Sequence, residues 1–211
     1  MTPNALGLDT ANKSQGLDVI PAGTQVELVM KIRAGSVGLE NLCKRSSKGD
    51  AEGLDLEFTV RGDDYDGRKL YAFQVLNGTT AGHAKAAEIT RALLRAIFEA
   101  TNAIDPNDNA AATITRRANA TLTEFNGAIF LATLEVEHGG KRPDGTGNYR
   151  DKNIIGKVLR VGDPGYRKLD QPPAMPIERS APPAQPYAAA PAGGGSPAVA
   201  PATIAKPSWA Q

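Results

Sequence analysis

The sequence has few of the residues on which enzymes and metal proteins most often depend. It holds one cysteine, Cys43, which excludes an intrachain disulfide and an all-cysteine metal cluster. The two histidines, His83 and His138, have no Cys or His partner at metal-ligand spacing, and both are best interpreted as solvated. Lys44 and Arg45 could lower the pKa of Cys43, but no base is identifiable, which favours a bystander thiol. We therefore expect no catalytic residue, no metal and no cofactor.

An excess of charge of one sign and a long apolar run are also missing. The chain has 24 basic and 23 acidic residues. The last forty-one residues hold two of the basic and one of the acidic residues, so residues 1–170 contain 22 of each. This excludes the globally basic signature of a nucleic-acid binder. No run approaches the ~20 apolar residues that span a bilayer, and the N-terminus lacks the features of a signal peptide. We expect a soluble, cytoplasmic protein with no membrane partner.

Proline and alanine are concentrated at the end of the sequence. Residues 171–211 contain ten prolines and twelve alanines but only three charged residues. Such a composition buries too little apolar area to offset the entropy of ordering and predicts a disordered tail. The predicted organisation is a flexible arm (1–16), one domain (17–170) and the disordered tail (171–211).

Hydrophobic periodicity predicts mostly strands within the domain. In residues 24–33, Val26, Leu28, Met30 and Ile32 alternate with mainly polar residues, which is the period of a strand with one buried face. Further strands are predicted over residues 54–61, 68–76, 128–137 and 153–161. Between the third and fourth strands the apolar spacing changes to three and four. It predicts one long helix from Thr79 or Thr80 to about residue 102, followed by a short helix or turn around 114–122.

This order of three strands, a helix and two strands is that of the OB-fold, a five-stranded Greek-key barrel. We therefore predict a mainly β domain with one long helix and an OB-fold-like barrel, while an α+β sandwich would read the same way. The aspartates of residues 62–67 are interpreted as turn formers rather than a carboxylate site. The glycine-rich loop 139–147 joins two strands and lacks P-loop spacing.

A basic hairpin near the end of the domain carries the positive evidence for a function. Residues 138–169 hold eight Lys or Arg against three Asp. Cations neutralise phosphates, and an aromatic ring offers a face on which a base can stack. The candidate nucleic-acid-binding residues are Lys141, Arg142, Tyr149, Arg150 and Lys152 of the hairpin, Lys31, Arg33, Lys44, Arg45 and Lys48 in and after the first strand, and Tyr71 and Phe73 on the third. The alternative is that both third-strand rings are core residues and the hairpin is only solvated.

Several short motifs resemble a known phage family. They are Leu17-Asp-Val-Ile-Pro-Ala-Gly23, Asp66-Gly-Arg-Lys69, the helix that follows, and Tyr149-x-Asp-x-Asn153-x-Ile155. Together they resemble the phage-encoded domain of unknown function numbered 669, over residues 17–168. The resemblance implies an OB-fold-like protein that binds single-stranded DNA in phage replication or recombination, in the host cytoplasm, without sequence preference or catalysis.

The tail supplies a second hypothesis. Its tip holds the only tryptophan, Trp209, in a segment that could dock a partner. The alternative function is a protein–protein adaptor that recruits phage or host recombination or replication proteins through the domain surface and this tip. The oligomeric state, monomer or homo-oligomer, stays open.

Overall fold

The structure, a computed structural model, describes residues 18–173 and 175–178. The predicted flexible arm and most of the predicted tail, Trp209 included, lie outside the described residues. The strands are β1 (Gln25–Ile32), β2 (Lys44–Arg45), β3 (Ala51–Arg61), β4 (Lys69–Gly78), β5 (Ile129–Glu137) and β6 (Lys152–Val158), and the helices are α1 (Ala81–Thr101) and α2 (Ala111–Ala118). Three short 3-10 turns, η1 (Leu39–Asn41), η2 (Asp63–Tyr65) and η3 (Leu122–Phe125), complete the elements.

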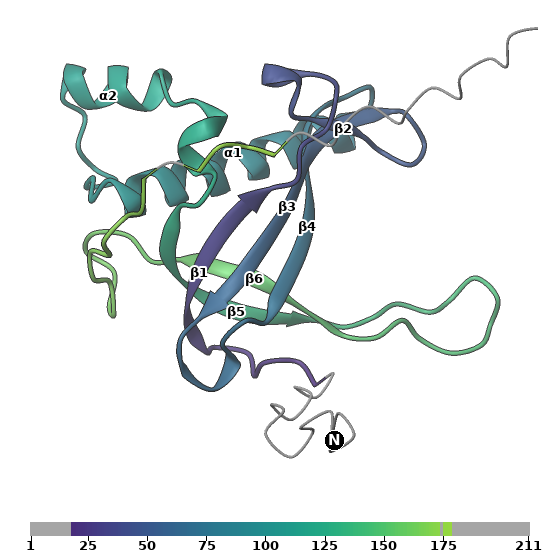
Figure 1. Ribbon diagram of the computed structural model, residues 1–211. Coiled ribbons are helices and arrows are strands. Elements are labelled where there is room, and N and C mark those ends of the chain that lie inside the picture. The colour runs from purple at the N-terminus through teal and green to yellow at the C-terminus, as the bar shows by residue number, and fades with distance from the viewer. Residues whose placement is uncertain (1–17, 174, 179–211) are drawn as a thin grey trace, which may run out of the picture. The chain divides into compact units, whose positions relative to one another are not determined.

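One antiparallel sheet contains all six strands. β3 pairs with β4 along one edge and with β1 and then β2 along the other, while β5 joins the free edge of β1 and β6 the free edge of β5. In Figure 1 the strands β1, β3 and β4 cross β5 and β6 at a steep angle, so the sheet is strongly curled. The mainly β architecture predicted from the sequence is confirmed, whereas β2, only two residues long, lies where no strand was predicted.

The sheet is open rather than closed into a barrel. Its outer strands are β4 and β6, and among the described residues no hydrogen-bonded ladder joins them. Both strands instead line two cavities of about 240 Å³ each, one of which contains Leu70 and Tyr71 of β4 with Ile154 and Ile155 of β6. A closed five-stranded barrel is therefore not formed by these hydrogen bonds, although the two outer strands approach each other.

Alternation decides which side of the sheet is buried. Val26, Leu28, Met30 and Ile32 of β1 are buried as predicted. The core centres on Phe58 of β3, whose ring meets that of Phe130 of β5 edge to face, with the centroids 6.1 Å apart. The other large, fully buried side chains come from β1, β3, β5 and α1, together with Ile20 in the segment before β1.

Helix α1 begins where the sequence predicts, and it buries most of the expected apolar face, with one exception. Thr80 caps it, since its hydroxyl accepts a hydrogen bond from the backbone N–H of His83 at 3.2 Å. Ile89, one of the apolar residues that predicted the helix, is 60% exposed, and Thr90 is buried in its place. The short helix or turn expected around 114–122 corresponds to the helix α2 and the turn η3, so the domain has a second helix besides the long one. Neither helix of the described chain is long and apolar enough to cross a membrane.

Side-chain amides satisfy backbone groups at three places where the ladders stop. Asn153 accepts from the N–H of Ile20 at 2.8 Å and donates to its carbonyl at 2.7 Å. Gln171 pairs in the same two-bonded way with the backbone of Ile129, at 2.9 and 2.7 Å. Each amide acts as a short piece of neighbouring strand, which removes the cost of an unpaired backbone group.

The third amide fastens residues that the sequence assigned to the tail. Asn126, buried, accepts from the N–H of Ile32 at 2.9 Å and donates to the carbonyls of Met175 and Pro176. With Gln171, this contact lays the described part of 171–178 against the domain. β5 is buried on both faces from Ile129 to Ala132, and Gln171 contacts the first of these residues.

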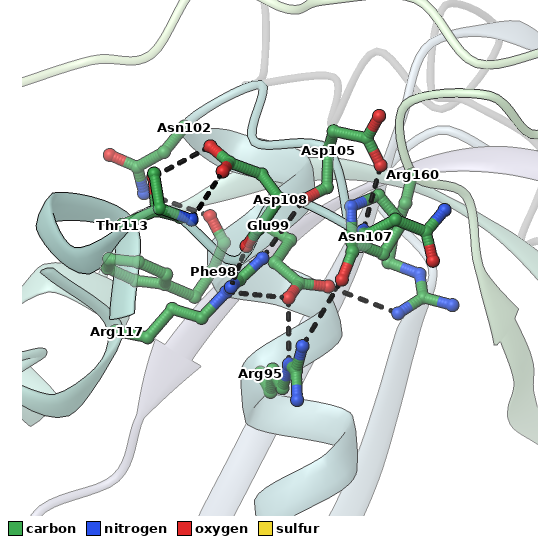
Figure 2. A network of polar contacts seen from close by, with 12 residues as sticks. Arg95, Phe98, Glu99, Asn102, Asp105, Asn107, Asp108, Thr113, Arg117 and Arg160 are labelled. Atoms are coloured by element: carbon green, nitrogen blue, oxygen red, sulfur yellow. Dashed lines mark hydrogen bonds and ion pairs between the residues drawn. The ribbon is translucent and has the colours of Figure 1, made fainter. Parts of the chain in front are cut away.

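A buried carboxylate joins α1, α2 and the residues after β6 (Figure 2). Glu99 of α1 is fully buried and lies within ion-pair distance of three guanidinium groups. Arg95 Nε is 2.7 Å from Oε1, Arg117 Nε of α2 is 2.9 Å from the same oxygen, and Arg160 Nη1 is 3.1 Å from Oε2. The charge of Glu99 is thus compensated by side chains from three segments distant in sequence.

Arg117 also organises the loop between the two helices. Its terminal nitrogens donate to the carbonyls of Asp108 at 2.7 Å and Asp105 at 2.9 Å. The Asp108 carboxylate in turn accepts from the backbone N–H of Ala110 and the hydroxyl of Thr113 at the start of α2, and these hydrogen bonds hold the pKa of Asp108 below its usual value. The position of α2 therefore depends on Glu99 through Arg117.

We expect Glu99→Gln to lower the free energy of unfolding by roughly 3–5 kcal/mol, because breaking a buried ion pair leaves cations without compensation. Denaturant unfolding followed by circular dichroism would measure the change. Glu88→Gln, on the exposed face of the same helix, is the matched control and should stay within about 0.5 kcal/mol of the parent. Equal midpoints for Glu99→Gln and the parent chain would contradict the structural role assigned to this cluster.

Candidate nucleic-acid interface

The outer face of β1, β3 and β4 presents three cross-strand rows of side chains. The register aligns Val29 with Thr59 and Lys69, and Lys31 with Glu57 and Tyr71. In the third row the N–H of Arg33 bonds to the carbonyl of Asp55, which is opposite Phe73. Four of the predicted binding residues, Lys31, Arg33, Tyr71 and Phe73, therefore share one face of the sheet.

The carboxylates in these rows already engage several of the cations. Asp55 lies 3.5 Å from Arg33 and 2.6 Å from the Nζ of Lys44. Glu57 lies 2.7 Å from Lys69, and this hydrogen bond raises the pKa of Lys69 above its ordinary value. A polyanion that bound to this face would compete with Asp55 and Glu57 for the same cations.

Both rings on this face are exposed rather than part of the core. Tyr71 is 54% exposed and Phe73 42%. The guanidinium of Arg33 lies over the Tyr71 ring, 5.5 Å from its centroid. Phe73 lies over Gly53 of β3, where an added Cβ would come within 3.0 Å of the ring. The alternative that these rings are core residues is wrong.

The loop between β5 and β6 extends away from the sheet (Figure 1) and carries the second group of predicted residues. Its two arms continue the hairpin irregularly, with an isolated bridge between Lys141 and Asn148 and a hydrogen bond of 2.8 Å from the Tyr149 N–H to the Gly140 carbonyl. Gly139 is required by this approach, since a Cβ there would lie 1.8 Å from the Tyr149 carbonyl oxygen. The glycine at this position therefore allows the two arms of the hairpin to approach each other.

An arginine also covers the ring in this loop. Arg142 lies 5.5 Å from the centroid of Tyr149, which is 54% exposed, so the loop repeats the arrangement of Arg33 and Tyr71. Within the described chain no ion pair joins Lys141, Arg142 or Arg150 to a carboxylate. The hairpin thus offers cations with fewer competitors than the sheet face.

The carboxylates near the hairpin are held by its own turns. The Thr146 backbone N–H and hydroxyl hydrogen-bond to Asp144 and lower its pKa. Asp151 accepts from the Gly139 N–H at 2.9 Å and lies 2.8 Å from His138 Nδ1, and these contacts, the first above all, lower its pKa. His138 therefore has a local structural contact.

One cavity lies where β4 approaches the start of β6. It measures about 240 Å³ and is lined by Lys69 and Tyr71 of β4 and by Asp151, Lys152 and Asn153 at the start of β6, with Val19, Ile20, Arg68 and Leu70. Lys152 itself pairs with Glu137 at 3.3 Å. The structure thus brings Tyr71 and Lys152, 81 positions apart in the chain, to the same cavity.

Two predicted residues lie elsewhere. Arg45 is paired with Glu52 at 3.8 Å, five residues along β3 from Glu57, a separation of roughly 17 Å. Lys48 is exposed in the turn that follows β2. Both belong to the other end of the β3–β4 pair from Tyr71. Lys31 remains on the face, 3.6 Å from Glu178.

Sequence reasoning missed Lys69, Asp55 and Glu57 as members of this face. The alternation of residues 54–61 already placed Asp55 and Glu57 on the solvent side. Their neighbours on β1 and β4 depend on strand register, which no local pattern reports.

His83, the aspartates of the β3–β4 turn and Cys43 are the other residues considered as functional candidates. His83 completes the cap of α1, and the Gly62 N–H donates to Asp66 at 2.7 Å in the β3–β4 turn. In the part of the chain that the structure describes, no three His, Cys, Asp or Glu side chains gather closely enough to hold a metal ion. Cys43 is buried, and burial raises the pKa of its thiol, so Lys44 and Arg45 do not activate it.

Comparison of the chain with protein-family models, with curated proteins and with solved structures finds no match.

We expect Cys43 to react with a chromogenic disulfide reagent much more slowly in the native protein than in denaturant. The thiolate is the reactive form, and burial disfavours it and blocks access. Absorbance of the released aromatic thiol, followed with and without guanidinium chloride, measures both rates. Rapid reaction of the native protein at neutral pH would contradict the buried position of this side chain.

Proposed function

We propose that this protein binds single-stranded DNA through the outer face of β1, β3 and β4 together with the β5–β6 hairpin. The observation that carries the proposal is the repeated pair of an exposed tyrosine and an arginine, Tyr71 with Arg33 on the sheet face and Tyr149 with Arg142 on the hairpin. Bases stack on the rings, and the surrounding cations hold the phosphates.

The chemistry of these groups favours a single strand over a duplex. Stacking on a side-chain ring requires an unpaired base whose face is accessible, and it tolerates every base. Lys141, Arg142 and Arg150 contact phosphates without reading sequence. Binding is therefore without sequence preference and without catalysis.

The same proposal includes the OB-fold-like character of the domain and its biological role. The strand order and the proximity of β4 and β6 support an OB-fold-like barrel with a gap between these two strands. The resemblance to the phage domain of unknown function 669 supports a role in phage DNA replication or recombination in the host cytoplasm.

We expect the full chain to bind a labelled single-stranded oligonucleotide with micromolar or tighter affinity, strongly weakened by salt. Fluorescence anisotropy at two salt concentrations measures this. Tyr71→Ala and Tyr149→Ala should each cost roughly 1–3 kcal/mol of binding free energy through lost stacking. Ile89→Ala, an equally exposed apolar residue on α1, is the control and should bind like the parent. Absence of binding at low salt, or equal affinity for a duplex, would refute the proposal.

We expect Asp55→Asn to strengthen oligonucleotide binding, because it releases Arg33 and Lys44 for phosphates. The slope of log affinity against log salt should steepen by about one. Glu124→Gln, which releases Arg116 near α2, is the matched control and should leave the affinity unchanged. Weaker binding by Asp55→Asn would show that the carboxylate positions the cations rather than competing for them.

The second candidate is a protein–protein adaptor that recruits replication or recombination proteins. The pairing of Asp55 and Glu57 with the cations favours it, because a face of mixed charge suits a protein partner. Removing residues 179–211 separates the two functions. An adaptor acting through the Trp209 tip loses its partner, whereas a DNA-binding domain keeps its oligonucleotide affinity.

A further inference from the structure

An apolar groove lies between α1 and α2, away from the candidate nucleic-acid interface. It measures about 480 Å³, against about 240 Å³ for the cavity beside Tyr71. Apolar side chains of several elements form its walls: Leu39, Leu76, Leu94, Phe98, Ala118, Ala120, Leu122 and Phe125. Leu39 at its mouth is 57% exposed, a costly arrangement for a side chain that has no partner.

Three arginines and no carboxylate complete the lining of this groove. They are Arg91, Arg95 and Arg117. Arg91 donates to the Leu76 carbonyl at 3.5 Å, and among the described residues no carboxylate pairs with it. Arg116, next along α2, lies over the Phe98 ring at 4.6 Å from the centroid. The rim is therefore cationic around an apolar floor.

The carboxylates near this rim are already engaged. Glu99 is buried under three arginines, and Glu124 pairs with Arg116. Glu40 accepts from the backbone N–H of Leu122 at 3.0 Å. Of the three arginines that line the groove, Arg95 and Arg117 pair with Glu99, so Arg91 is the one that keeps an uncompensated charge among the described residues.

The two helices extend this surface in the same pattern. On α1, Arg91, Leu94, Arg95 and Phe98 recur at three- and four-residue spacing and so share a face. On α2, Ile114 is one turn before Ala118 and is 52% exposed. An elongated apolar surface flanked by arginines matches the helix-in-groove mode of peptide recognition.

We propose that this groove is a docking site for an acidic, amphipathic segment of a partner protein. Apolar side chains of the segment enter the groove, and its carboxylates meet Arg91 and Arg95 at the rim. The partner is another protein, since residues 179–211 of this chain hold Arg179 and Lys206 but no Asp or Glu, and residues 1–17 hold only one Asp against one Lys. In a symmetric contact between two copies of the chain, the arginines of one copy would face the same arginines of the other. Repulsion between these like charges disfavours such a dimer. The inference is independent of DNA binding by the sheet face.

The test uses the full chain and two labelled synthetic peptides followed by fluorescence anisotropy. One carries Leu and Phe at helical spacing among Glu and Asp, and the other keeps these apolar residues with Lys in place of each acid. We expect the acidic peptide alone to bind. Arg91→Glu and Leu39→Asp should each weaken its binding by roughly tenfold or more. Lys85→Glu and Ile89→Asp, exposed on the opposite face of α1, are the matched controls and should leave it unchanged.

Two further measurements make each outcome decisive. Thermal unfolding verifies that each variant is folded, and Arg91→Gln replaces Arg91→Glu if the latter is not. Oligonucleotide binding by the groove variants should equal that of the parent, which separates failure of this proposal from failure of DNA binding. Equal binding of the basic peptide, equal losses in the control variants, displacement of the peptide by the oligonucleotide, or a dimer in sedimentation that Arg91→Glu dissociates would each overturn the proposal.

Discussion

The arrangement of the helices depends on the carboxylate of Glu99, which is fully buried. A carboxylate in that position is stable only if cations surround it, and Arg95, Arg117 and Arg160 come from α1, α2 and the end of β6 to do so. The same contact sets the distance between α1 and α2 and so shapes the groove between them. One buried charge therefore links the packing of the helices to a surface with its own binding chemistry.

A second constraint is the supply of backbone partners at the edges of an open sheet. Asn126, Asn153 and Gln171 each present an amide that pairs with a backbone N–H, and all three also donate to backbone carbonyls. These contacts attach the segments before β1 and after β6 to the sheet. The outer strands β4 and β6 are not joined by a ladder among the described residues, and Tyr71 and Lys152 line a cavity between them.

The candidate interface combines cations with the carboxylates that hold them in place. On the sheet face, Asp55 and Glu57 keep Arg33, Lys44 and Lys69 ordered, and the face is nearly neutral as a result. On the hairpin, the carboxylates of Asp144 and Asp151 accept hydrogen bonds from the hairpin's own residues. The guanidinium of Arg142 pairs with no carboxylate among the described residues and lies over the Tyr149 ring. A ligand that is both aromatic and anionic would stack on the exposed rings of the sheet face. Its negative charges would meet cations on the hairpin that have fewer carboxylate partners.

Local sequence determined every strand except the short β2, the start of α1 at Thr80 and the buried residues of β1 and β3, because the alternation of apolar side chains reports directly which side of a strand avoids water. It also indicated that Arg33 and Tyr71 could serve one surface. Only the tertiary structure decided that Ile89 faces solvent, that Glu99 is buried, that Arg45 lies at the other end of β3, and that the sheet is open. Each of these depends on which distant segment covers a side chain or pairs with a strand, and periodicity shows that a face is apolar without showing what covers it.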